Sequence, residues 1–60
     1  MTHAEIASRC PLTTATVGKI ATHLKGLTHA ESLRLIELAR LGLSERGLIE
    51  RLEQDRTKHG

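Results

Sequence analysis

The sequence predicts an all-α fold, a compact bundle of about four short helices. Three observations support this prediction: capping residues alternate with Pro or Gly along the chain, apolar residues recur between them at helical spacing, and no segment alternates like a strand. The chain has 60 residues and no aromatic side chain, so we expect one small domain over residues 1–60 with a thin aliphatic core. We therefore expect a partner chain to supply further buried surface.

A capping box predicts where the first helix begins. Thr2 stands at the N-cap, and Glu5 at the third helical position reaches back to the Thr2 amide. The helix is expected from about 3 to 10 and ends before Pro11, because proline cannot continue the hydrogen-bond ladder.

A second helix is expected to begin after Thr13, which caps it, and to run to about residue 25. Gly26 then stands where a left-handed C′ residue is expected. One apolar stripe at helical spacing consists of Val17, Ile20, Ala21 and Leu24.

The second half of the chain predicts two more helices. The tetrapeptide 28–31 repeats the opening Thr-His-Ala-Glu and starts a third helix to about residue 41, which Gly42 closes. Ser44 caps a fourth helix, which is expected to fray into a solvated tail over residues 55–60. The apolar residues of the fourth helix are Leu48, Ile49 and Leu52.

The composition argues against several classes of protein and site. The single cysteine, Cys10, forms no internal disulfide, and neither a signal peptide nor an apolar membrane span is visible, so we expect a cytoplasmic protein without a membrane partner. A domain this small is not expected to hold a catalytic pocket, so we expect neither an enzyme nor a cofactor. No metal site is expected, because no close ligand spacing occurs among the candidates His3, His23, His29 and Cys10.

Residues 3–22 carry a pattern of two helices joined by a short turn. Ala7 supplies a small residue where two helices would cross, and Thr13 caps the second helix. The apolar residues that would fill the angle between the helices are Ile6, Cys10, Leu12, Val17 and Ile20. On these residues the segment resembles the helix-turn-helix family of DNA-binding proteins. It departs from the family pattern at Pro11, where the turn commonly has a glycine with positive φ.

The resemblance implies that the second helix is a recognition helix for the major groove of duplex DNA. Its outward residues, the candidate DNA-binding set, are Thr13, Thr14, Ala15, Gly18, Lys19, Thr22, His23 and Lys25. Threonine can contact phosphates, base edges or a thymine methyl, and Lys19 can reach guanine or a phosphate. A transcriptional regulator or a plasmid or phage accessory factor is then expected. The alternative, that these threonines only fill an exposed helix, stays open.

A second, rougher pattern of the same kind covers residues 34–52. It has a glycine in the turn, Gly42, but its outer face mixes glutamates with arginines, which would repel phosphates about as much as attract them. We therefore interpret the fourth helix as a brace or a dimer arm, although recognition by the fourth helix instead of the second stays open.

The third helix is apolar over more than one face, which favours a homodimer seam, although a central helix that contacts neighbours on both sides within one chain stays open. The expected dimer interface consists of Leu33, Leu35, Leu38, Leu41, Leu48 and Leu52. A two-fold dimer would place two recognition helices about one DNA turn apart, roughly 34 Å. The alternative function is a helical protein-interaction module, such as an adaptor, inhibitor or assembly subunit, whose third helix docks on a larger protein without any DNA binding.

Overall fold

The computed structural model describes the backbone of residues 1–59 and the side chains of residues 1–57. This part of the chain forms four α-helices and no strand: α1 (His3–Arg9), α2 (Thr14–His23), α3 (His29–Arg40) and α4 (Glu45–His59). The prediction of an all-α bundle of four short helices is therefore confirmed. Among the helices described, none is long and apolar enough to cross a membrane.

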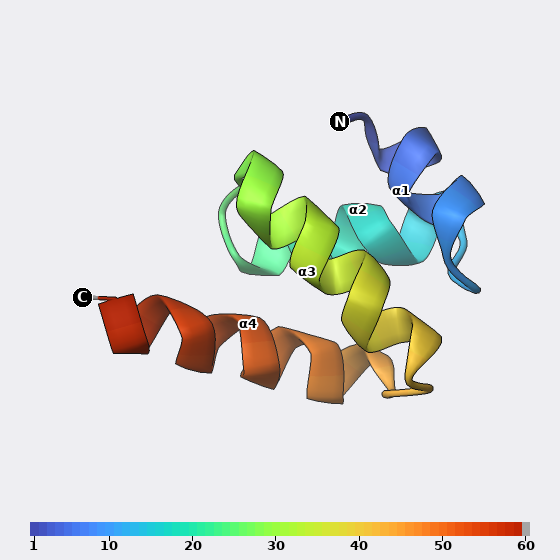
Figure 1. Ribbon diagram of the computed structural model, residues 1–60. Helices are drawn as coiled ribbons and strands as arrows, with labels where there is room; N and C mark the ends of the chain where they lie inside the picture. Colours follow the sequence, from blue (N-terminus) through green and yellow to red (C-terminus); the bar gives the residue numbers. More distant parts are fainter. Residues whose placement is uncertain (60) are drawn as a thin grey trace.

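The helices pack so that each contacts two others. α1 packs on α2 and α3, and α4 packs on α3 and α2. In Figure 1, α3 crosses in front of α2, and the C-terminal end of α4 extends past the other helices. The core lies inside this arrangement, and every helix contributes at least one fully buried residue. The largest of these are Ile6, Val17, Ile20, Leu35, Leu38, Leu48 and Leu52.

The single chain buries most of the residues that were expected in a dimer interface. Leu35, Leu38, Leu48 and Leu52 are each at most 1% exposed and belong to the chain's own core, so their assignment to the interface was wrong. The physical reason is that α4 packs on both α3 and α2. Sequence periodicity shows which residues of α3 are apolar, but it does not show that another helix of the same chain covers them. Leu33 and Leu41 remain exposed, at 42% and 75%.

The turn between α1 and α2 accommodates Pro11 without any residue in the left-handed region. α1 ends at Arg9, and the Leu12 amide donates to the Cys10 carbonyl at 2.8 Å. A bond between residues i and i+2 closes a γ-turn around the central residue, and the common inverse form has a φ close to that of proline. The glycine that the family pattern places here is therefore unnecessary. At the start of α1, Thr2 accepts from the Glu5 amide, but the returning bond from the Glu5 side chain is absent, so only half of the predicted capping box forms.

The end of α2 differs from the sequence prediction by one residue. The C-cap is Leu24, and Lys25, with φ 60°, occupies the left-handed C′ position that was expected for Gly26. The Gly26 amide donates to Ala21 O at 2.7 Å and the Lys25 amide to Thr22 O at 3.1 Å. These two bonds are the pair that defines a Schellman motif. α2 thus stops with a lysine in a backbone conformation that favours glycine.

The termini of α3 and the start of α4 follow the predictions. Thr28 and Glu31 form a complete capping box at the start of α3, and Gly42, with φ 88°, follows its C-cap. Ser44 Oγ accepts from the Gly47 amide at 3.2 Å, so Ser44 caps α4 as expected.

The expected frayed tail from residue 55 was wrong for the residues whose side chains are described. α4 continues helically, and the side chains of Asp55 and Arg56 bind other elements of the fold. Gly60 lies outside the described residues, and so do the side chains of residues 58 and 59.

Candidate nucleic-acid interface

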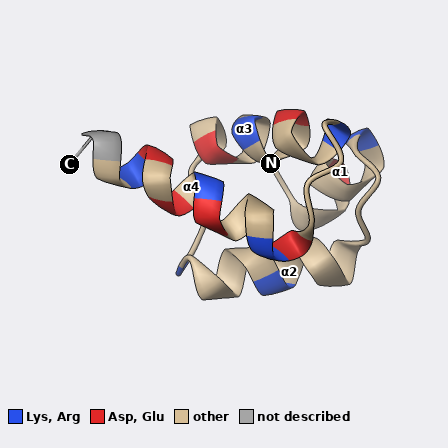
Figure 2. Cartoon of the chain, turned by 90° about the horizontal axis from the view of Figure 1, so that it is seen from below, with Lys and Arg blue, Asp and Glu red and all other residues tan. Residues whose placement is uncertain are grey.

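The predicted DNA-binding residues lie on the accessible side of α2 and on the turn that follows it. The opposite side of the helix is buried in the core through Val17, Ile20 and Ala21, and this burial fixes the orientation of α2 in the fold. Gly18 is half-buried, and the other seven predicted residues are exposed: Thr13, Thr14, Ala15, Lys19, Thr22, His23 and Lys25. α2 contains one lysine and no acidic residue, and in Figure 2 it shows blue and no red.

A shallow hollow lies in the middle of this side of α2. It is lined by Ala15, Gly18, Lys19, Thr22 and His23 of α2 and by His3 of α1. From the sequence alone, His3 was named only among the rejected metal-ligand candidates, and the packing of α1 against α2 places it beside the hollow. No sequence signal links residue 3 to residues 15–23, because only the fold brings them together.

Gly18 is one of the residues that line the hollow, and nothing in its surroundings requires a glycine there. A Cβ atom built at this position would meet only His3 Nδ1, at 3.8 Å, which is ordinary contact. Glycine inside a helix costs about 0.5–1 kcal/mol relative to alanine. The fold therefore tolerates a destabilising residue here, and its missing side chain lets a ligand approach the helix backbone closely.

Two of the threonines have structural roles as well as exposed positions. Thr13 Oγ1 accepts from the Thr16 amide at 3.2 Å and caps α2 as predicted. Thr22 Oγ1 donates to Gly18 O at 2.9 Å. In this conformation the Thr22 hydroxyl is committed as a donor and can only accept from a ligand. The interpretation of Thr13 as exposed filler does not hold, since it stabilises the helix start.

The charge around α2 is uneven. No acidic residue occurs between Glu5 and Glu31. At the C-terminal end of α2, however, a second hollow is lined by His23 together with residues of α4: Glu45, Arg46, Ile49, Glu50 and Glu53. Figure 2 shows α4, with acidic and basic residues, running beside α2. Glu50 pairs with Arg46 at 3.5 Å, an i, i+4 pair on an exposed surface. The exposed side of α2 therefore has no carboxylate of its own, but glutamates of α4 lie along one edge of it.

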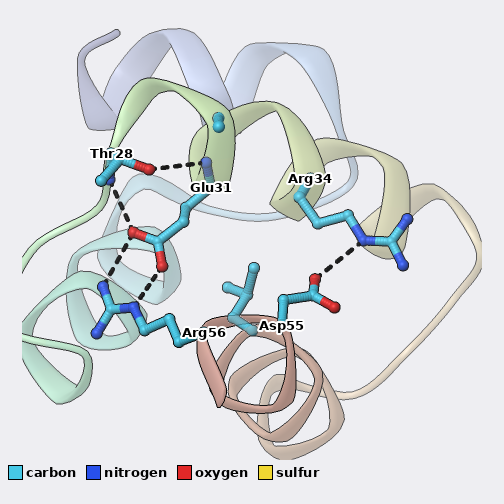
Figure 3. Close-up of a pocket in the computed structure, with 7 residues that line it drawn as sticks. Thr28, Glu31, Arg34, Asp55 and Arg56 are labelled. Atoms are coloured by element: carbon cyan, nitrogen blue, oxygen red, sulfur yellow. Dashed lines mark hydrogen bonds and ion pairs between the residues drawn. The ribbon is translucent and has the colours of Figure 1, made fainter. Parts of the chain in front are cut away.

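Two ion pairs connect α3 to the end of α4. Arg34 Nε lies 3.2 Å from Asp55 Oδ2, and Arg56 binds the carboxylate of Glu31 with Nε and Nη2 (Figure 3). The hydrogen bond from Arg56 is the main reason that the pKa of Glu31 falls to about 2, and the Thr28 amide contributes to the same shift. These pairs line an open groove between α3 and α4, and each carboxylate in it already has a cationic partner. The two ion pairs stabilise the packing of α4 on α3, and they leave neither carboxylate in the groove without a cationic partner.

Cys10 and the histidines do not build a metal site. Cys10 Sγ donates to Ile6 O at 3.1 Å, and burial raises the pKa of this thiol, so it packs as a small apolar residue. Within the described residues, no three His, Cys, Asp or Glu side chains come together as metal ligands.

Comparison with protein-family models, with curated proteins and with solved structures finds no significant match to this chain.

Proposed function

We propose that this chain binds duplex DNA by placing the exposed side of α2 in the major groove. The observation that carries the proposal is the composition of that side: small residues around Gly18, two lysines, and no carboxylate on the helix. An α-helix with its side chains is about 10–12 Å across, and the major groove is about 12 Å wide, so α2 fits in the groove with its small residues inward. Lys19 and the threonines supply contacts to phosphates and base edges.

The same proposal includes a homodimer that pairs the exposed parts of α3. Leu33 and Leu41 are the exposed leucines of the described chain, about 12 Å apart along the helix. Covering them in a two-fold contact would place two copies of α2 on one duplex, with half-sites about 34 Å apart. A regulator of transcription, or an accessory factor of a plasmid or phage, in the cytoplasm, is the role that we propose for such a dimer.

The proposal is tested by binding of the full 60-residue chain to fluorescently labelled duplex DNA at 50 and 200 mM salt. Lys19→Ala is expected to weaken binding by about 1–3 kcal/mol, or about 5- to 150-fold. The matched control is Arg51→Ala, which removes an exposed cation from α4 outside the hollows beside α2 and is expected to change affinity less than twofold. Glu50→Gln removes a carboxylate at the edge of α2 and is expected to raise affinity.

Each variant addresses a different part of the proposal. A parent chain that fails to bind any duplex at 50 mM salt refutes DNA binding. Equal losses in Lys19→Ala and Arg51→Ala would show that nonspecific charge, and not α2, accounts for the interaction.

A second candidate function is a protein-interaction module, and the exposure of Leu41 favours it. Leu41, which is 75% exposed, offers an apolar anchor for a helix of another protein, and Leu33, which is 42% exposed, offers a second one about two turns earlier in α3. The two functions differ in their response to Leu41→Glu. In a DNA-binding dimer this substitution shifts the chain toward monomer in sedimentation and weakens DNA binding together, whereas a protein-interaction module binds no DNA before or after the substitution.

A further inference from the structure

The last turns of α4 reach the turn that ends α2. Arg56 Nη1 donates to Leu24 O at 2.6 Å, and Nη2 donates to Gly26 O at 2.7 Å. The same guanidinium binds both carboxylate oxygens of Glu31 at the start of α3 (Figure 3). One side chain thus connects α4 with the end of α2 and the start of α3.

The two carbonyl groups that Arg56 binds flank Lys25. With φ 60°, Lys25 is the one non-glycine residue with positive φ among those described. An L-residue in the left-handed region is disfavoured, so a conformation of this kind persists where surrounding contacts hold it. The Schellman bonds hold the Lys25 turn from the side of α2, and Arg56 holds it from the side of α4.

The direction of the Lys25 side chain matters because acidic and basic groups meet beside it. A hollow at the end of α2 is lined by Lys25 together with Glu53 and Arg56 of α4. If the turn were loose, the Lys25 ammonium could pair with the Glu53 carboxylate instead of a phosphate. A turn held on both sides fixes the direction in which the Lys25 side chain leaves the backbone.

We propose that Arg56 is a positioning residue for the nucleic-acid interface: by binding Leu24 O and Gly26 O it fixes the turn that presents Lys25 to the phosphate backbone. This inference rests on the proposed function and adds to it a residue that sequence reasoning assigned to a frayed tail. Arg56 acts through Lys25, so its effect on DNA binding depends on the presence of the lysine.

A double-mutant cycle with Arg56→Lys and Lys25→Gln tests this dependence on labelled duplex DNA. Arg56→Lys keeps the charge but loses the fork of donors, and Lys25→Gln removes one cation while keeping a long side chain. Loss of one phosphate contact lowers the slope of log affinity against log salt by about 0.9, which is about eightfold in affinity at 0.1 M salt. We expect that result for Lys25→Gln. Arg56→Lys is expected to lower affinity about two- to fourfold in the parent and less than twofold in the Lys25→Gln background.

A matched control and an independent measurement complete the test. Arg34→Lys alters the neighbouring pair with Asp55, which does not contact the α2 turn, and is expected to leave the salt slope unchanged. In the free protein, Arg56→Lys is expected to speed hydrogen exchange at the Lys25 and Gly26 amides, while the amides in the middle of α2 keep their protection.

The outcomes separate this inference from the function on which it rests. Unchanged exchange at both amides overturns the positioning role, whatever the DNA result. A parent that binds DNA, combined with equal effects of Arg56→Lys in both backgrounds, overturns the positioning role and leaves the proposed function standing. A parent that binds no duplex overturns both.

Discussion

Replacing Lys25 by glycine is expected to stabilise the fold, because it relieves a left-handed backbone conformation at the end of α2. Lys25 has φ 60°, a conformation that costs a non-glycine residue about 1–2 kcal/mol. Glycine removes that cost but loses about 0.5–1 kcal/mol through the greater freedom of the unfolded chain. The net gain is about 0.5–1 kcal/mol, which corresponds to a rise in melting temperature of roughly 2–8 °C for a domain of this size.

The equivalent position after α3 provides a control of opposite sign. Gly42 has φ 88°, and a Cβ built there would meet no atom within 4 Å, so Gly42→Ala changes the backbone preference without a steric clash. This substitution is expected to destabilise the chain by a similar amount. The assay is thermal and urea unfolding followed by circular dichroism at 222 nm. A loss of stability in Lys25→Gly, or a gain in Gly42→Ala, would refute the reasoning from backbone conformation.

Three further predictions concern stability. Gly18→Ala is expected to raise the free energy of unfolding by about 0.5–1 kcal/mol in the same melts, because the added methyl group meets no close neighbour; a loss would show that the helix needs a glycine there. Leu52→Ala is expected to cost about 2–5 kcal/mol and to leave little folded protein at 25 °C, whereas Leu41→Ala changes monomer stability by less than about 0.5 kcal/mol. The pKa of Glu31 is lowered from 4.5 to about 2 in the folded chain, so its contribution is fully present above pH 4.5 and is lost as the pH falls toward 2. Glu31→Gln should therefore flatten the fall in unfolding free energy between pH 4.5 and 2, and a parallel fall in both proteins would contradict the Arg56 pairing.

Most features that depend on residues close together in the sequence were predicted correctly, whereas features that depend on residues far apart were not. Thr13 and Thr28 were identified as caps because capping depends on residues three positions apart, and both caps form. The left-handed position after α2 was placed on Gly26 by residue preference, but the helix stops one residue earlier and Lys25 takes it. Gly26 has positive φ as well, at 110°, and Arg56 of α4 binds the carbonyls on both sides of Lys25, which no local pattern could predict.

The same distinction between local and long-range interactions applies to the candidate site. Helical periodicity separates the buried Val17 and Ile20 from the exposed side of α2, so the DNA-binding set could be predicted as a surface. Its neighbours could not be predicted. His3 beside the hollow and the glutamates of α4 along the edge are remote in sequence, and their placement depends on how α1 and α4 pack against α2.

By itself, the sequence determined the four helices, their N-cap residues and the exposed side of α2, because these depend on backbone preference and apolar spacing within one or two turns. Only the tertiary structure decided which leucines are free for a partner. A buried stripe has the same sequence pattern whether it packs on its own chain or on another, and here Leu35 and Leu38 are buried within the chain's own core while Leu33 and Leu41 stay exposed. The tertiary structure likewise decided the role of Arg56. From the sequence, a charged residue near the end of a helix is expected to be exposed to solvent, but in the fold Arg56 binds the Glu31 carboxylate and the carbonyls of Leu24 and Gly26, which are remote in sequence.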